Sequence, residues 1–301
     1  NPNSDPQPDY WTNYLNLLMK HNGSSKETLA VALRAFALPN QTEELACTIA
    51  KIFNNNNLPS KSLEALNKIK APNSCNYQAL MIAAYVNQRN ISRANQLVSE
   101  HLVSCAEHDT FAINAIDATL RNLEPNLLLE RVNFLTTANA SPLVQIKCAQ
   151  ALEALGQTEK AVDLLRTVEP NLQTSREKGA FVAALAPHLD PKEALKHLNS
   201  AMDTINVKKQ RATHSILMFR KASTYERLND TQRQVEALKL ANCIEFNLRK
   251  PSYLSLEAKW DQSREVWERM NRISSASPEL KLDFGGPIVF IVGLPRCGST
   301  A

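Results

Sequence analysis

The residues of this sequence that could do chemistry lie close together, between Gly293 and Thr300. Their spacing is Gly293-x-x-x-x-Gly298-Ser-Thr, and the loop contains one cation, Arg296. The preceding residues, 288–292, are apolar and mostly β-branched, which predicts a short strand buried on both faces. A strand, a glycine-flanked loop and a helix N-terminus direct unpaired N–H groups and the positive end of a helix dipole at one point. The sequence therefore predicts an anion-binding loop.

The spacing of this loop resembles the nucleotide-binding P-loop, G-x-x-x-x-G-K-[ST], but its lysine is missing. Ser299 occupies the lysine position, and Arg296 lies three residues earlier. That lysine normally contacts the β- and γ-phosphates, while the hydroxyl binds magnesium. A donor without a γ-phosphate and without an obligatory metal therefore fits this loop better than a nucleoside triphosphate does.

Residues 287–300 resemble the first strand and the 5′-phosphosulfate-binding loop of sulfotransferases. The matching pattern is Pro-Ile-x-Phe-Ile-Val-Gly-x-Pro-Arg-x-Gly-Ser-Thr. It is most similar to the bacterial type that carries tetratricopeptide repeats ahead of the catalytic domain, and protein-tyrosine sulfotransferases have a similar loop. The resemblance implies an α/β sulfotransferase domain that uses 3′-phosphoadenosine 5′-phosphosulfate (PAPS) as donor substrate and no metal.

The resemblance also implies roles for five residues of the loop. Arg296 is the expected catalytic residue, because the family places there a Lys or Arg that polarises the transferred sulfuryl group. Arg296, Cys297, Gly298, Ser299 and Thr300 are expected to surround the 5′-phosphosulfate. Cys297 departs from the family pattern, in which Ser is commoner. Since backbone N–H groups do much of the holding, we expect binding to survive this departure.

The elements that position this loop differ from the rest of the chain in glycine content. Of the seven glycines in 301 residues, four lie in the last segment: Gly285, Gly286, Gly293 and Gly298. The composition therefore marks a boundary near residue 285. The net charge of +4 is slight, and no dense Lys/Arg run with interleaved aromatic residues points to nucleic acid.

The six cysteines are scattered and include no C-x-x-C pair. In a chain of this size, that spacing predicts reduced thiols in a cytoplasmic protein, with neither a disulfide scaffold nor a zinc site. The sequence contains no run of about 18 apolar residues, so we expect no membrane-spanning helix.

Residues 10–249 have the apolar spacing of consecutive helices, and a repeat runs through them. The clearest unit, from Ala149 through Gly156 to Ala161, resembles the tetratricopeptide pattern. The same twelve-residue offset recurs along the chain and predicts about seven helix pairs. The offset pairs are Leu17 with Leu29, Ala50 with Ser62, Ile82 with Ala94, Ala115 with Leu127, Ala149 with Ala161, Val182 with Ala194, and Ala222 with Gln234.

The predicted fold is therefore mainly α, a tetratricopeptide-like α-α superhelix followed by the first β-strand and P-loop-like turn of a truncated sulfotransferase domain. Residues 1–8 are a flexible lead-in, and residues 9–250 form the repeats. Residues 251–284 form a capping helix with Trp260 and Trp267 and then a linker, and residues 285–301 begin the sulfotransferase domain.

These features predict the N-terminal part of a sulfotransferase whose repeats bind protein or peptide on their concave face. An interaction scaffold without enzymatic activity and a P-loop ATPase or kinase with a repeat-based sensor are the alternatives. A basic segment, with Lys208, Lys209, Arg211, Arg220, Lys221 and Arg227, is either a solvated helix face or a site for an acidic peptide.

The helix expected after Thr300, the general base and the 3′-phosphate site would all lie beyond Ala301. We therefore expect the 301-residue piece to be incomplete and catalytically inactive by itself, and measurable sulfate transfer by this piece would contradict that expectation.

Overall fold

The computed structural model describes residues 7–22, 26–72, 74–122, 124–137, 140–207 and 210–247. The chain divides into two compact units, Asn1–Tyr253 and Leu254–Ala301, and every described residue belongs to the first. All regular secondary structure among the described residues is helical. The predicted capping helix, linker, strand and P-loop-like turn lie outside them, so their boundaries stay predictions.

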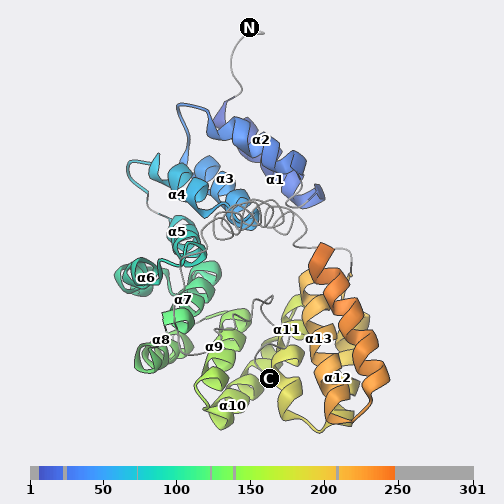
Figure 1. Cartoon of the computed structure of the whole chain (residues 1–301). Helices are drawn as coiled ribbons and strands as arrows, with labels where there is room; N and C mark the ends of the chain where they lie inside the picture. The colour runs from blue at the N-terminus through green and yellow to red at the C-terminus, as the bar shows by residue number, and fades with distance from the viewer. Residues whose placement is uncertain are drawn as a thin grey trace, which may run out of the picture. The chain divides into compact units, whose positions relative to one another are not determined.

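The helices follow one another with short connections (Figure 1). In chain order they are α1 (Pro8–Asn22), α2 (Lys26–Phe36), α3 (Glu43–Asn55), α4 (Pro59–Asn67), α5 (Cys75–Asn87), α6 (Ile91–Cys105), α7 (Asp109–Asn122), α8 (Pro125–Thr137), α9 (Pro142–Ala154), α10 (Thr158–Val168), η1 (Glu169–Asn171), α11 (Ser175–Leu185), η2 (Ala186–His188), α12 (Pro191–Thr204) and α13 (Arg211–Arg227). Residues 231–247 are helical as well.

Consecutive helices form pairs, as the twelve-residue offset predicts. Helix α3 packs on α4, α5 on α6, α9 on α10 and α11 on α12. Each odd-numbered helix from α3 to α11 also contacts the next odd-numbered helix. The described residues therefore form a series of helix pairs in which the odd-numbered helices make one continuous stack.

Four turns within these pairs share one backbone geometry. Asn57, Arg89, Gly156 and Asn229 have positive φ angles of 57°, 62°, 74° and 57°, and each lies seven residues after the first member of its offset pair. In each turn the next residue donates its N–H to a carbonyl five residues back, as in Leu58 N to Phe53 O at 2.8 Å and Gln157 N to Leu152 O at 2.9 Å. This is the Schellman end of a helix, which favours glycine at the left-handed position. The chain therefore reverses direction with the same backbone geometry in four of the repeats.

Small residues lie at the helix crossings of the central pairs. Ala50, Ser62, Ala94 and Ala194 have no exposed surface, and Ala149 and Ala161 are equally enclosed. The offset fails at the first pair, where Leu17 is 54% exposed and Leu15 and Leu18 are buried in its place. At the last pair Gln234 is only half-buried, and Ala237 and Ala241 fill the contact.

The cysteine prediction is wrong for one pair. Cys75 and Cys105 form a disulfide with a Cα–Cα distance of 5.4 Å. Cys75 is the first residue of α5 and Cys105 the last of α6, so the reversal of the chain between these helices brings the two ends together. Because this disulfide contradicts the prediction of reduced thiols, the cysteines no longer support a cytoplasmic location. Cys47 and Cys148 are free and buried, and Cys243 is free and exposed.

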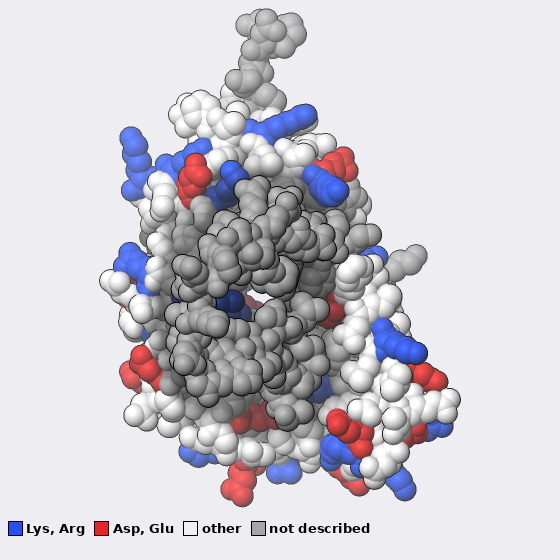
Figure 2. Space-filling model, in the orientation of Figure 1, with Lys and Arg blue, Asp and Glu red and all other residues white. Residues whose placement is uncertain are grey.

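The described surface mixes both signs of charge. Figure 2 shows Lys and Arg interspersed with Asp and Glu around the described part of the visible face. None of the described helices combines the length and the apolar character needed to cross a bilayer.

The shared turn geometry predicts opposite effects for two substitutions. Arg89 is exposed, and its Cβ makes the left-handed conformation sterically unfavourable, whereas Gly156 has no Cβ and adopts that conformation without this cost. We expect Arg89→Gly to raise the free energy of unfolding and Gly156→Ala to lower it, each by about 1 kcal/mol. Urea unfolding followed by circular dichroism measures both changes, and a loss of stability in Arg89→Gly would contradict the shared geometry.

Candidate functional site

The residues predicted to bind the sulfuryl donor cannot be placed in the fold. Arg296, Cys297, Gly298, Ser299 and Thr300 all lie outside the described residues, so their assignment stays a prediction. The candidate site that the described residues offer is the stack of odd-numbered helices, together with the polar groups that join one helix to the next.

Polar side chains bridge successive helices of this stack. Asn54 Nδ2 in α3 donates to Leu80 O in α5 at 3.3 Å, and Asn114 Nδ2 in α7 donates to Ala79 O at 2.8 Å. Lys147 Nζ in α9 lies 2.7 Å from Asp117 Oδ1 in α7, and these two side chains are 25% and 41% exposed. We call Asn54, Asn114, Asp117 and Lys147 the seam residues.

The seam residues can do two things at once. Each is half-buried, and its polar group holds neighbouring pairs in register. Asn54 Oδ1 is itself buried without a hydrogen-bond partner, so the groups that partly face solvent are those of Asn114, Asp117 and Lys147. An amide, a carboxylate and an ammonium group offer both donors and acceptors to an extended backbone. The arrangement suits noncovalent recognition of a polypeptide.

A buried arginine fixes three helices beside this stack. Arg131 in α8 is 2% exposed, and its Nη2 donates to Asn95 O at 3.1 Å and to Ser99 Oγ at 3.0 Å, both in α6. Its Nη1 donates to Asn95 Oδ1 and to Thr119 Oγ1 in α7. No carboxylate among the described residues forms an ion pair with this guanidinium.

Desolvation lowers the pKa of the Arg131 guanidinium, because burial penalises the charged form. Four hydrogen bonds to neutral oxygens compensate part of that cost. Arg131 was not predicted as a structural residue, although the sequence contained a signal for it. Arg131 lies three residues after Leu128 and four before Leu135, on the apolar side of its helix, where a charged residue needs partners.

The residues of the predicted basic segment make different contacts in the structure. Arg227 donates to Ala186 O at 3.3 Å and to Leu189 O at 2.6 Å, so it anchors the end of η2 to α13. Lys221 Nζ lies 5.9 Å from the centroid of the Tyr225 ring. Lys208 and Lys209 lie outside the described residues, so the acidic-peptide hypothesis stays a prediction. No cluster of three or more His, Cys, Asp or Glu side chains suited to a metal ion occurs in the described part of the chain.

The fold of this chain is similar to one in the crystal structure of the APC/C hetero-tetramer Cut9-Hcn1. The TM-score is 0.52 at 14% sequence identity, and the match covers 82% of this chain and 52% of that chain. The predicted tetratricopeptide-like α-α superhelix is thereby confirmed as the fold of the helical part. This chain spans about half the length of the chain it matches. No protein-family model and no curated protein sequence matches it.

The hydrogen bonds of Arg131 predict its contribution to stability. Arg131→Ala leaves the oxygens of Asn95 and Thr119 buried with fewer donors, and we expect the free energy of unfolding to fall by about 3 kcal/mol. Arg131→Lys should recover only part of this loss, because an ammonium group cannot reach both helices as a planar guanidinium does.

Arg121→Ala, at an exposed arginine of α7, is the control and should change stability by less than about 0.5 kcal/mol. Chemical denaturation measures all three variants. If Arg131→Ala unfolded at the same denaturant concentration as the control, the structural role of the Arg131 network would be refuted.

Proposed function

We propose that the helical repeats of this protein bind an extended segment of a protein partner along the stack of odd-numbered helices. The observation that carries the proposal is the unbroken series of contacts from α3 through α5, α7, α9 and α11 to α13. Such a series supports a long, pre-formed surface, and repeat folds of this kind use such surfaces for binding.

Pre-organisation is the physical reason for the proposal. Helices α5 and α9 bury side chains around most of their circumference, among them Leu80, Ile82 and Val86 in α5. The remaining exposed side of each helix is therefore held in place before a partner arrives. Binding there costs little conformational entropy. The seam residues then offer polar groups to the backbone of the bound segment.

The similar structure supports a protein-binding function by analogy. The APC/C structure is a hetero-tetramer, so a chain of this fold occurs there in an assembly. At 14% identity this likeness concerns the fold, and a protein partner for the present chain is our proposal.

Selection from a peptide library tests the binding surface. We expect selected peptides to slow amide hydrogen exchange in α5, α7 and α9. Lys147→Ala, at a seam residue, should weaken their binding by about tenfold, or roughly 1.4 kcal/mol. Lys160→Ala, at an exposed lysine of α10, is the matched control and should leave the affinity unchanged. Protection confined to the even-numbered helices would refute the proposed surface.

We also propose, as a second function, sulfuryl transfer from PAPS to an acceptor hydroxyl by a domain that begins near residue 285. The support is the sequence pattern from Gly293 to Thr300, with Arg296 as the cation expected to stabilise the developing charge. In this proposal the helical repeats hold the acceptor protein or a partner near the catalytic domain. The alternative, a repeat scaffold without enzymatic activity, needs no such domain.

Nucleotide binding by a protein that contains this sequence and the proposed domain tests the second function. 3′-Phosphoadenosine 5′-phosphate should raise its melting temperature without magnesium. Arg296→Ala should reduce the sulfate-transfer rate by about 100-fold or more, since it removes one electrostatic donor. Arg34→Ala, at an exposed arginine of α2, should keep the full rate. A requirement for magnesium would favour the P-loop ATPase or kinase alternative, and the absence of any nucleotide binding would favour the scaffold. Full turnover by Arg296→Ala would refute the role assigned to Arg296.

A further inference from the structure

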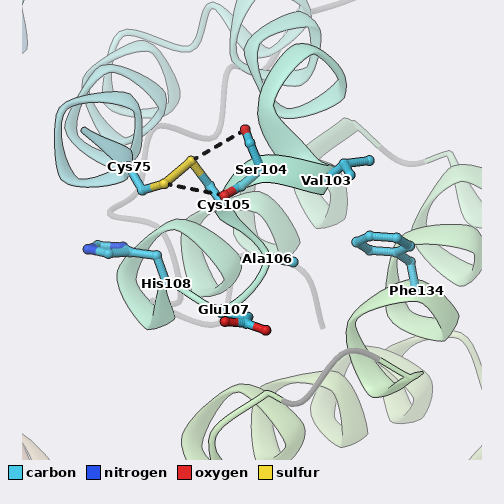
Figure 3. Close-up of a pocket in the computed structure, with 8 residues that line it drawn as sticks. All are labelled: Cys75, Val103, Ser104, Cys105, Ala106, Glu107, His108 and Phe134. Carbon is cyan, nitrogen blue, oxygen red and sulfur yellow. Dashed lines mark hydrogen bonds between the residues drawn. A yellow bond between two sulfur atoms is a disulfide. The ribbon is translucent and has the colours of Figure 1, made fainter. Parts of the chain in front are cut away.

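The disulfide between Cys75 and Cys105 lies at the wall of a cavity of about 450 Å³. Figure 3 shows the two sulfur atoms on one side of this cavity and Phe134, from α8, on the other. The remaining walls come from the end of α6 and the connection that follows it. They are Val103 and Ser104 in α6, and Ala106, Glu107 and His108 in the connection that leads to α7. The volume lies in the range of small-molecule sites.

The two sulfur atoms differ in access. Cys75 is half-buried, whereas Cys105 is 4% exposed. Val103, whose side chain borders the same cavity, is 82% exposed, so the approach from this side is open. A thiolate that enters the cavity can therefore reach Cys75 Sγ more readily than Cys105 Sγ.

The surroundings of each sulfur suit exchange. Ser104 Oγ lies 3.1 Å from His101 O, to which it donates, and 3.8 Å from Cys105 Sγ. When the disulfide opens, rotation of this hydroxyl directs its proton at the Cys105 thiolate and stabilises the negative charge. Cys75 is the first residue of α5, with Ser74 as the N-cap, so the helix dipole favours a thiolate there only when both cysteines are reduced, and that thiolate can then attack an oxidised thiol. In an exchange at Cys75 Sγ, the leaving thiolate of the pair is Cys105.

We propose that Cys75–Cys105 is a thiol–disulfide exchange site that takes a low-molecular-weight thiol as a covalent ligand on Cys75. The thiolate of the ligand attacks Cys75 Sγ, a new S–S bond forms, and the Cys75–Cys105 bond breaks. Cys105 leaves with the electron pair and then takes one proton from solvent. The reverse attack by the Cys105 thiolate on Cys75 Sγ expels the ligand and restores the disulfide.

The fold tolerates this exchange. Helices α5 and α6 also share buried side chains, including Ile82, Ala94 and Val98, so the pair stays packed when the bond opens. The disulfide closes a loop with a sequence separation of 30 residues between its ends. Opening it should lower the melting temperature without unfolding the protein.

Two other cysteines provide internal controls. Burial raises the pKa of the Cys47 thiol and of the Cys148 thiol to about 12, so both should stay inert in the folded protein. Cys243 is exposed and Cys297 lies outside the described residues, so both are replaced by serine and neither thiol obscures the measurement.

The experiment incubates the folded protein that carries Cys243→Ser and Cys297→Ser with reduced glutathione, quenches it with acid and maps the modified peptides by mass spectrometry. We expect glutathione on the peptide that contains Cys75 and a free thiol at Cys105. When Cys105→Ser is incubated with oxidised glutathione, the Cys75 thiolate should take one glutathione as a stable mixed disulfide and release the other as a thiol, because the resolving thiol is missing. Cys47 and Cys148 should stay unmodified in that second incubation. Val103→Trp fills the cavity and should slow modification several-fold while the melting temperature stays the same.

The proposal is overturned if glutathione reacts with this disulfide only after denaturation, which would mark it as a structural bond. Attachment to Cys105 instead of Cys75 would also overturn it, as would an unchanged rate in Val103→Trp. The wild-type cysteine pair is tested directly, so the first result does not depend on whether a variant folds.

Discussion

Packing between neighbouring helix pairs is the interaction on which this structure depends. A single pair has an apolar face on each side and can bury both only against the pairs before and after it. Helix α9 makes this dependence visible, because its buried residues Val144, Ile146, Cys148 and Ala151 point in several directions around the helix. Small residues such as Ala149 and Ala161 let the backbones approach closely at the crossings, and the contacts then run from pair to pair along the chain.

Polar groups add specificity to this packing without replacing it. The Arg131 guanidinium can be buried only because α6 and α7 present oxygen atoms at the right distance, so it fixes the spacing of three helices. The seam residues do the same along the odd-numbered helices, in positions that stay partly open to solvent. A partner that binds there would meet a surface whose geometry is set by the core beneath it, which is why recognition is the function we favour.

The sequence predicted the helix pairs well because their signal is local. The twelve-residue offset reflects the small residues that lie where paired helices cross. Gly156 marks the left-handed turn between two helices. The equivalent turns at Asn57, Arg89 and Asn229 were not predicted, because residues other than glycine occupy the left-handed position. The registers at Leu17 and Gln234 failed at the first and last described pairs, where the described residues supply a neighbouring pair on only one side.

Long-range features were harder to predict. The separation of 30 between Cys75 and Cys105 becomes informative only when the two cysteines are placed at the open ends of one helix pair. The partners of Arg131 are 12 to 36 residues away in sequence, so no local pattern identifies them. The anion-binding loop was recognised from residues 287–300 alone and remains a prediction about a segment outside the described fold.

Native-state hydrogen exchange tests the dependence on neighbouring pairs most directly. If each pair is held by those beside it, amides of α5, α7 and α9 exchange slowest, and protection declines in steps toward α1 and toward residues 231–247. Equal protection in every helix, or slowest exchange in the first or last pair, would contradict this account.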